Sequence, residues 1–142
     1  MVAFLDLKSA FDSVDRQALW QSLVIKGVPT KFLSLLKALY ANSRGRVRVY
    51  GKFSPEFTTF KGVRQGCPPS PFLFNFVIDM LMESLQFSDT SGVELLPGRC
   101  LSDIEYADDI ALLGSDPTQM QVTLNKINKS AGKFGMHFEP PR

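Results

Sequence analysis

The feature that most limits how this chain can fold is one long apolar segment, SPFLFNFVIDMLMESL, at residues 70–85. Apolar side chains lie nearly all round a helix drawn through residues 72–85, which predicts a helix buried among other elements. Asn75, Asp79 and Glu83 interrupt the segment. It is therefore a poor candidate for a transmembrane helix, which needs about 20 predominantly apolar residues.

Length and composition fit a single globular domain. The chain has 142 residues, of which 44% are hydrophobic and 21% are charged, close to globular averages. Its net charge of +2 is too small to indicate nucleic-acid binding by itself. Cys67, Cys100 and the single His137 lack the spacing of a zinc site, so we expect reduced thiols in an intracellular protein. Met1 leads directly into an apolar run without a signal-peptide pattern, which suggests an internal start of a longer protein.

The expected elements alternate between strands and helices. VAFLD, residues 2–6, is typical of a central strand buried on both faces. Ser13, Thr30 and Ser70 each suit a helix cap, and Gly51 and Pro55 suit the turns of a hairpin. In order, we expect the strand at 2–6, helices at 13–27 and 30–43, a hairpin at 46–60, the helix at 70–85, a turn-rich connection at 89–100, strands at 101–106 and 109–114, a helix from Asp116 to Gly135 and a short last strand. This order predicts an α+β fold, with a mainly antiparallel sheet and helices packed on one face.

Three carboxylates end or interrupt these strands. Asp6 ends the first strand, and Asp108 and Asp109 lie at the bend of the later hairpin. If the strand lies beside that hairpin, the carboxylates converge, which is unfavourable unless a cation neutralises them. Mg²⁺ prefers oxygen ligands, and two such ions about 3.5 to 4 Å apart can activate a hydroxyl and stabilise a leaving pyrophosphate. The alternative is that Asp108 and Asp109 are turn residues, for which aspartate is common.

Other acidic residues have simpler explanations. Asp12 and Asp15 suit the start of a helix, where a carboxylate caps the backbone and offsets the helix dipole. Asp79 and Glu83, four residues apart, suit the solvated edge of a helix better than a ligand site. We therefore expect a structural role for all four.

The loop GVRQGCPPSP, residues 62–71, has the composition of a phosphate-binding or nucleotide-binding segment. Glycines permit close backbone approach to a ligand, Gln65 can hydrogen-bond a base or sugar, and the following helix amino terminus favours phosphate. Lys8 follows Asp6 closely enough to contact a phosphate. The alternative is an ordinary loop that enters a helix.

Three motifs carry a resemblance to a known family. FLDLKSAFDSV, GVRQGCPPSPFLFNFVID and YADDIALL, in this order, resemble motifs A, B and C of a reverse transcriptase. Within these motifs, the sequences AFDSVDR, RQGC and YADD are most similar to those of non-LTR, LINE-type retrotransposon enzymes. The resemblance implies a polymerase palm, a ferredoxin-like antiparallel sheet with helices packed on one face. It makes Asp6 and Asp108 the principal ligands of two Mg²⁺ ions, for which Mn²⁺ can substitute, with Asp109 as the third acidic member and the Leu7 carbonyl completing one shell.

The resemblance also implies a nucleotide pocket. Phe11 matches an aromatic gate beneath the incoming sugar, where the ring leaves no room for a 2′-hydroxyl; the alternative is a core phenylalanine. The positions that match nucleotide-binding residues are Lys8, Ala10, Phe11, Gln65 and Gly66.

The carboxy-terminal stretch departs from the family pattern. GMHFEPPR resembles a degenerate motif D, with Glu139 where asparagine is usual and Arg142 where lysine is usual. The family lysine is thought to protonate pyrophosphate, and arginine, with a pKa above about 12, is a poor proton donor. Arg142 is thus expected to contact pyrophosphate through its charge. Pro69 stands where many relatives carry leucine.

The resemblance covers the palm only, so residues 1–142 are expected to be a partial reverse transcriptase domain that lacks fingers and thumb. The modest charge follows, since the parts that grip phosphate lie mostly outside the segment. We expect little or no processive synthesis from the isolated chain.

Three hypotheses remain open. The first is RNA-directed DNA synthesis in retrotransposition, with an RNA template, a DNA primer and dNTPs as partners, no membrane, and the nucleus as the compartment that the family implies. The second is a degenerate or domesticated palm that acts as a non-catalytic RNA-binding or interaction module. The third, another two-metal nucleotidyltransferase or a cyclase, leaves RQGCPPSP and Phe11 unexplained.

Overall fold

The computed structural model describes residues 1–85, 87 and 92–139 as a mixed helix and strand structure, which confirms the predicted class. The elements in chain order are β1 (Val2–Asp6), α1 (Ala10–Ser13), α2 (Arg16–Ile25), α3 (Thr30–Ala41), β2 (Arg44–Gly45), β3 (Arg48–Val49), β4 (Lys52–Phe53), β5 (Phe57–Thr58), α4 (Ser70–Glu83), β6 (Val93–Leu96), β7 (Arg99–Leu101), β8 (Asp103–Tyr106), β9 (Asp109–Leu113) and α5 (Pro117–Lys133).

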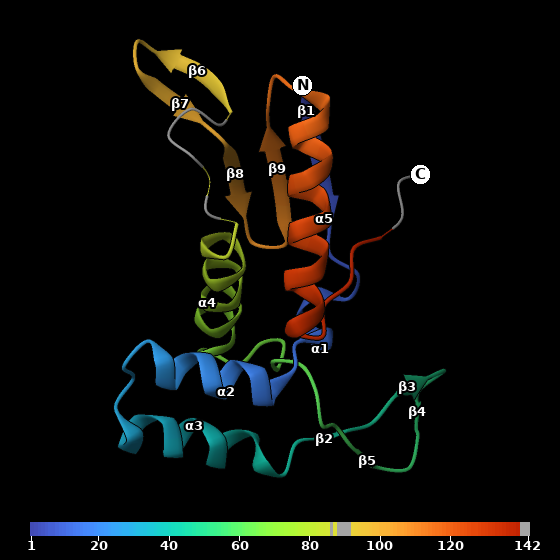
Figure 1. The fold of residues 1–142 in the computed structure, drawn as a ribbon. Coiled ribbons are helices and arrows are strands. Elements are labelled where there is room, and N and C mark those ends of the chain that lie inside the picture. The colour runs from blue at the N-terminus through green and yellow to red at the C-terminus, as the bar shows by residue number, and fades with distance from the viewer. Residues whose placement is uncertain (86, 88–91, 140–142) are drawn as a thin grey trace.

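The central sheet joins the first strand to the hairpin near the end of the chain. Its strand order is β1-β9-β8, and both pairs are antiparallel (Figure 1). After α5 the chain returns beside β1, where Leu7 and Phe138 form an isolated antiparallel bridge. The segment at Phe138, β1, β9 and β8 therefore lie in that order, and the last described residues lie beside the carboxyl end of β1.

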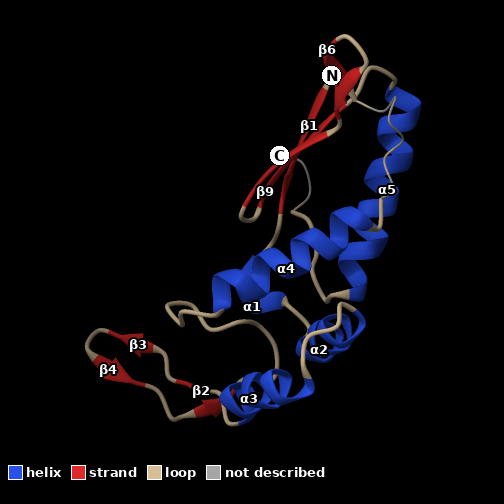
Figure 2. Ribbon diagram, turned by 90° about the vertical axis from the view of Figure 1, so that its left-hand side faces the viewer, coloured by secondary structure: helices blue, strands red, loops and turns tan. Residues whose placement is uncertain are grey.

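Helices cover one face of this sheet. Ile110 and Leu112 of β9 are 1% exposed and belong to the same core as Phe74 and Val77 of α4 and Ile127 of α5. Figure 2 shows α5 along one side of the sheet and the β3–β4 hairpin projecting toward the other side.

The opposite face of the sheet is open, which corrects the expectation that β1 is buried on both faces. Phe4 is 84% exposed and Val2 is 51% exposed. Their neighbours Ala3 and Leu5 are partly buried against the core. The apolar run suggested two covered faces, but an antiparallel sheet with helices on one side buries only alternate residues.

The starts of α2 and α4 differ from expectation in the residue that caps each helix. Asp15, rather than Ser13, caps α2, and its side chain accepts a hydrogen bond from the Ala18 N–H at 2.9 Å. This confirms the structural role expected for Asp15. Ser70 is the first residue of α4 rather than its cap. It is buried there, and its hydroxyl lies 2.7 Å from that of Tyr40.

Two hairpins extend from the body. The hairpin expected near Gly51 is confirmed, because β2 pairs with β5 and β3 pairs with β4. Within the connection expected at 89–100, residues 89–91 lie outside the described part, but β6 and β7 form a hairpin that the sequence interpretation missed. Both strands are short and mostly exposed, so they lack a clear alternating pattern. Among the described residues, no helix is long and apolar enough to cross a membrane.

Candidate functional site

The pairing of β1 with β9 places two carboxylates opposite each other. Asp6 is the register partner of Asp109, and Asp109 is also opposite Tyr106 of β8. Directly opposed residues of an antiparallel pair share a face, so all three side chains belong to the open face of the sheet. Asp6 and Asp109 line one hollow of about 390 Å³ together with Phe4, Leu5 and Ile110. The predicted convergence of the first strand with the hairpin is present for this pair.

Asp108 lies in the tight turn that joins β8 to β9. Tyr106 pairs with Asp109, which leaves Ala107 and Asp108 as a two-residue connection. Ala107 has φ 54°, a left-handed conformation that usually requires glycine at this kind of turn. A strained residue between two strands of a candidate site favours a functional reason for the turn. Asp108 is half-buried there, whereas Asp109 is exposed.

A second cavity lies at the other side of this turn. It has a volume of about 530 Å³, and Phe11, Asn75, Tyr106 and Ala107 are among its lining residues. The Phe11 ring stacks on Phe74 with centroids 4.5 Å apart and an interplanar angle of 16°. Phe11 is therefore held firmly at the cavity wall while part of its ring packs on the core.

Acidic residues at the same cavity perturb one another. Desolvation, a hydrogen bond with Asp103 and the charges of Asp103 and Asp79 raise the pKa of the Glu105 carboxyl to about 7. Asp79 and Glu105 both line the cavity. At neutral pH this wall thus carries less negative charge than its composition suggests. Glu83, the other acidic residue of α4, instead pairs with Lys26 at 2.6 Å on the surface.

The predicted nucleotide-binding loop is attached directly to the segment that carries Phe11. The Val63 N–H donates to the Phe11 carbonyl at 2.7 Å, and the Gly62 N–H donates to the Val14 carbonyl at 2.8 Å. Gly62 has φ 79°, and a Cβ there would lie 2.8 Å from the Asp12 Cα and carbonyl oxygen. Only glycine allows this close approach of two backbones.

Arg16 fixes the same loop from the other side. Its Nε donates to the Gly62 carbonyl at 2.8 Å, and one terminal nitrogen donates to the Thr59 carbonyl at 2.9 Å. Its guanidinium carbon lies 5.1 Å from the centroid of the Tyr40 ring, and that of Arg64 lies 5.6 Å from it. Arg64 also donates to the Ser43 hydroxyl at 2.9 Å. Burial lowers the pKa of the Arg16 guanidinium. These contacts hold α2, α3 and the loop together.

The remaining predicted site residues fall in different environments. Gln65 and Gly66 are exposed beyond the fixed part of the loop, and Lys8 is exposed with its Nζ 3.9 Å from a Glu139 carboxylate oxygen. Leu7 is 3% and Ala10 is 5% exposed, so both side chains belong to the core. Arg142 lies outside the described residues.

The donor set suits a hard cation, since two carboxylates share one hollow on an open face. Within residues 1–85, 87 and 92–139, no group of three or more His, Cys, Asp or Glu side chains lies close enough to hold a metal ion. The structure thus brings Asp6 and Asp109 together as a pair, with Asp108 adjacent in the turn.

Sequence reasoning missed several residues of this region. It did not single out Tyr106 and Ala107, which line the cavity beside Phe11, or Arg16 and Tyr40, which hold the loop. Two signals in the sequence could have indicated them. Ala107 lies in a two-residue turn that usually contains glycine, and Arg16 directly follows Asp15, the residue that caps α2.

Comparison with known proteins identifies the class to which this fold and site belong. The family model described as reverse transcriptase (RNA-dependent DNA polymerase) matches residues 1–141. The chain belongs to this reverse transcriptase family, as its three motifs suggested.

Its relatives belong to non-LTR retrotransposons. The chain is 31% identical over 139 residues, or 98% of its length, to the retrovirus-related Pol polyprotein from type-1 retrotransposable element R2 of Nasonia vitripennis. It is 32% identical over 126 residues, 88% of its length, to that of the type-2 element R2DM of Drosophila melanogaster, and 31% identical over 82% of its length to the transposon TX1 149 kDa protein of Xenopus laevis. It spans only 13%, 12% and 9% of these three proteins.

Proposed function

We propose that this chain is the palm of an RNA-directed DNA polymerase that transfers a nucleotide from a dNTP to a primer 3′-hydroxyl. The observation that carries the proposal is the register of β1 with β9, which puts Asp6 opposite Asp109 beside the turn that holds Asp108. The strand order, in which the Phe138 segment, β1, β9 and β8 lie side by side with helices on one face, fits a ferredoxin-like palm.

Asp6, Asp108 and Asp109 are the residues that would hold two Mg²⁺ ions. When bound, these ions would neutralise the carboxylates and stabilise the charge that develops on the phosphates. Phe11, fixed by Phe74, would contact the sugar of the incoming nucleotide. Ala107 and Tyr106 would form the side of that pocket nearest the carboxylates.

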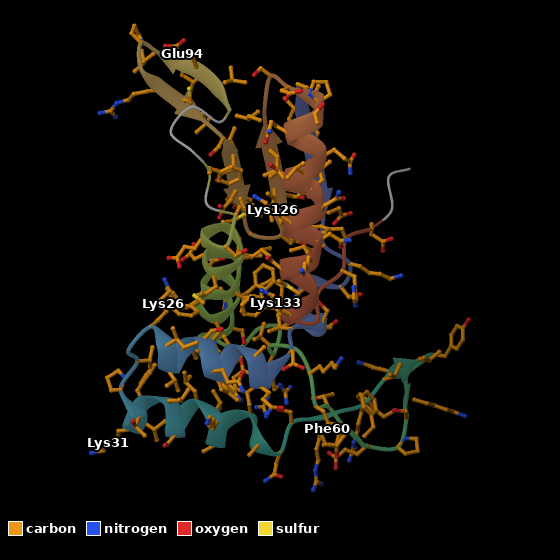
Figure 3. All side chains as sticks on the ribbon, in the orientation of Figure 1. Lys26, Lys31, Phe60, Glu94, Lys126 and Lys133 are labelled. Carbon is orange, nitrogen blue, oxygen red and sulfur yellow. The ribbon has the colours of Figure 1, made fainter. Side chains whose placement is uncertain are left out.

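The activity test is RNA-templated primer extension by the longest natural polypeptide that carries this segment. Asp108→Ala should abolish extension, because catalysis of this kind depends almost entirely on positioning and electrostatics. Lys31→Ala is the matched control, since this exposed residue of α3 lies far from the turn (Figure 3). Extension by Asp108→Ala at the rate of the control would contradict the proposal.

A second test needs no catalysis. Mg²⁺ at ten times its dissociation constant should stabilise the chain by about 1.4 kcal/mol, a rise in melting temperature of about 4 °C. Asp6→Asn should lose most of this rise. An equal rise in both proteins would show that Mg²⁺ does not bind at the carboxylate pair.

The Lys8–Glu139 pair favours the second candidate, a palm retained as a non-catalytic binding module. A carboxylate beside the lysine expected to contact phosphate competes with that phosphate. The module predicts that Mg²⁺ and dNTP bind independently, whereas a polymerase predicts that each tightens the binding of the other. Calorimetric titration of dNTP with and without Mg²⁺ distinguishes the two.

A further inference from the structure

The helix α3 carries two apolar stripes, of which only one is covered. The buried stripe, between 3% and 6% exposed, belongs to the core and consists of Leu33, Leu36 and Tyr40. The other, called here the outer stripe, is 55%, 65% and 41% exposed at Phe32, Leu35 and Leu39. The helix α2 contacts both α3 and α4 and lies between them, so α3 forms the outermost helical layer (Figure 1).

The spacing of the outer stripe is that of a helix face that packs on another helix. Its three residues follow one another at i, i+3 and i+7, the pattern by which helices recognise each other. Single exposed apolar side chains are ordinary, but three of them along one face indicate an interaction surface. The stripe extends over about two turns, or about 10 Å.

The charge around this stripe has one sign. Residues 16–55, which include α2 and α3, hold eight Lys and Arg residues and no Asp or Glu. At 100° per residue, Lys31 lies about 40° from Leu35 around α3, beside the stripe, whereas Lys37 lies about 150° from it, on the opposite side. Figure 3 shows Lys31 at the outer end of the helix, away from the sheet.

Lys31 can accept an added carboxylate as its partner. No carboxylate of the described residues lies within 4.0 Å of its ammonium, whereas Lys26 at the end of α2 already pairs with Glu83. Lys31 also belongs to the first turn of α3, which contains no acidic residue to offset the helix dipole. Both features favour negative charge at this end of the outer stripe.

We infer that the outer stripe of α3 is a docking site for an acidic amphipathic helix of a partner protein. Apolar side chains of that helix would cover Phe32, Leu35 and Leu39, and its carboxylates would lie beside Lys31 and the amino end of α3. A basic partner would be repelled by residues 16–55.

Other occupants fit the outer stripe less well. Leucine has no π-face on which a base could stack, so the stripe does not suit a nucleic acid. A second copy of the chain, docked through the same face, would place the lysines of the two helices against each other. The inference does not depend on the proposed polymerase, because no residue of the carboxylate site takes part in it.

The experiment measures fluorescence anisotropy of a designed, labelled helical peptide added to the 142-residue chain. The peptide has about 18 residues, with leucine at every third or fourth position and glutamate on both sides of the leucine stripe. One comparison peptide replaces glutamate by lysine, and another has the same composition in scrambled order. The acidic peptide should bind at least about tenfold more tightly than either comparison peptide.

Three variants locate the binding site. Leu35→Ser should weaken binding about tenfold while keeping the melting temperature, because this leucine is mostly exposed. Lys31→Glu should weaken binding of the acidic peptide and strengthen binding of the lysine peptide. Lys37→Glu is the matched control, since it makes the same change of net charge on the opposite side of the helix, and it should leave both affinities unchanged.

The inference is supported if only the variants of the stripe and of Lys31 change binding in these directions. Absence of binding, equal binding of the scrambled peptide, or an equal effect of Lys37→Glu would overturn it. Self-association in sedimentation velocity, or binding to phosphatidylserine vesicles, that Leu35→Ser abolishes would also overturn it, since the occupant would then be a second copy or a membrane.

The primer-extension test has a separate outcome. Extension without the peptide does not use the outer stripe, so Lys31→Ala keeps its place there as a control. A chain that binds the acidic peptide but belongs to a polypeptide that never extends a primer refutes the polymerase and leaves the docking site in place. Extension by a chain that binds no peptide refutes the docking site alone.

Discussion

Two glycines of the loop before α4 allow a direct test of how that loop is held. Gly62 has φ 79° and Gly66 has φ 78°. Replacing either glycine by alanine should therefore lower the free energy of unfolding by about 1 kcal/mol, because a residue with a Cβ disfavours the left-handed conformation. They differ in contacts. A Cβ at Gly62 would lie within 2.9 Å of backbone atoms of Phe11 and Asp12, whereas a Cβ at Gly66 meets nothing within 4 Å.

The structure therefore predicts unequal losses of stability. Forcing a methyl group against fixed backbone costs about 2 kcal/mol more, so Gly62→Ala should lose about 3 kcal/mol and Gly66→Ala about 1 kcal/mol. With a urea m-value of about 2 kcal/mol/M, the unfolding midpoint should fall by about 1.5 M and about 0.5 M respectively.

Asparagine separates the two causes, because it tolerates the left-handed conformation but still carries a Cβ. Urea unfolding should show that Gly66→Asn recovers part of the loss seen with alanine, and that Gly62→Asn recovers little. Equal midpoints for the two alanine variants would refute the close packing of this loop on the segment that carries Phe11.

Three further substitutions test other parts of the site. Arg16→Lys should lower the free energy of unfolding by about 2 kcal/mol in urea, since lysine keeps the charge but cannot contact the Thr59 and Gly62 carbonyls as a fork; a loss below about 0.5 kcal/mol would contradict this. Ala107→Gly should raise the unfolding midpoint by relieving about 1 kcal/mol of backbone strain, and an unchanged or lower midpoint would show that the turn is unstrained. Because the folded-state pKa of Glu105 is raised from 4.5 to about 7, stability should fall as pH rises through this interval, and Glu105→Gln should flatten that part of the stability profile.

The parts of the fold that local sequence determines were predictable. The apolar segment that became α4, the cap and proline that open α5, and the bend between β8 and β9 each depend on residues close together in the chain. The sequence predicted convergence of Asp6 with Asp108 and Asp109 only if the first strand lies beside that hairpin, and it did not indicate that Asp109 would be the residue opposite Asp6. Their roles as metal ligands, and that of Asp108, stay predictions.

The parts that depend on distant contacts were not predictable in the same way. Phe4 and Leu5 are both apolar, and only the position of the helices decides which of them faces solvent. The guanidinium groups of Arg16 and Arg64 both lie over the Tyr40 ring although they are 48 residues apart in the sequence, and no local pattern indicates these contacts. Ala10 is likewise 5% exposed in the core, a position that its match to a nucleotide-binding motif did not indicate.

The distribution of charge bears on how the proposed polymerase would hold its strand. Opposed carboxylates destabilise a strand pair and repel phosphate unless a cation lies between them, so the Asp6–Asp109 pair cannot by itself attract a polyanion. Residues 44–64 hold six Lys and Arg residues and one acidic residue, so positive charge is concentrated at a separate place in the sequence. In the proposed polymerase, affinity for the strand and dependence on Mg²⁺ therefore have separate origins. Salt should weaken strand binding without Mg²⁺ present, and removing Mg²⁺ should stop extension while leaving the strand bound.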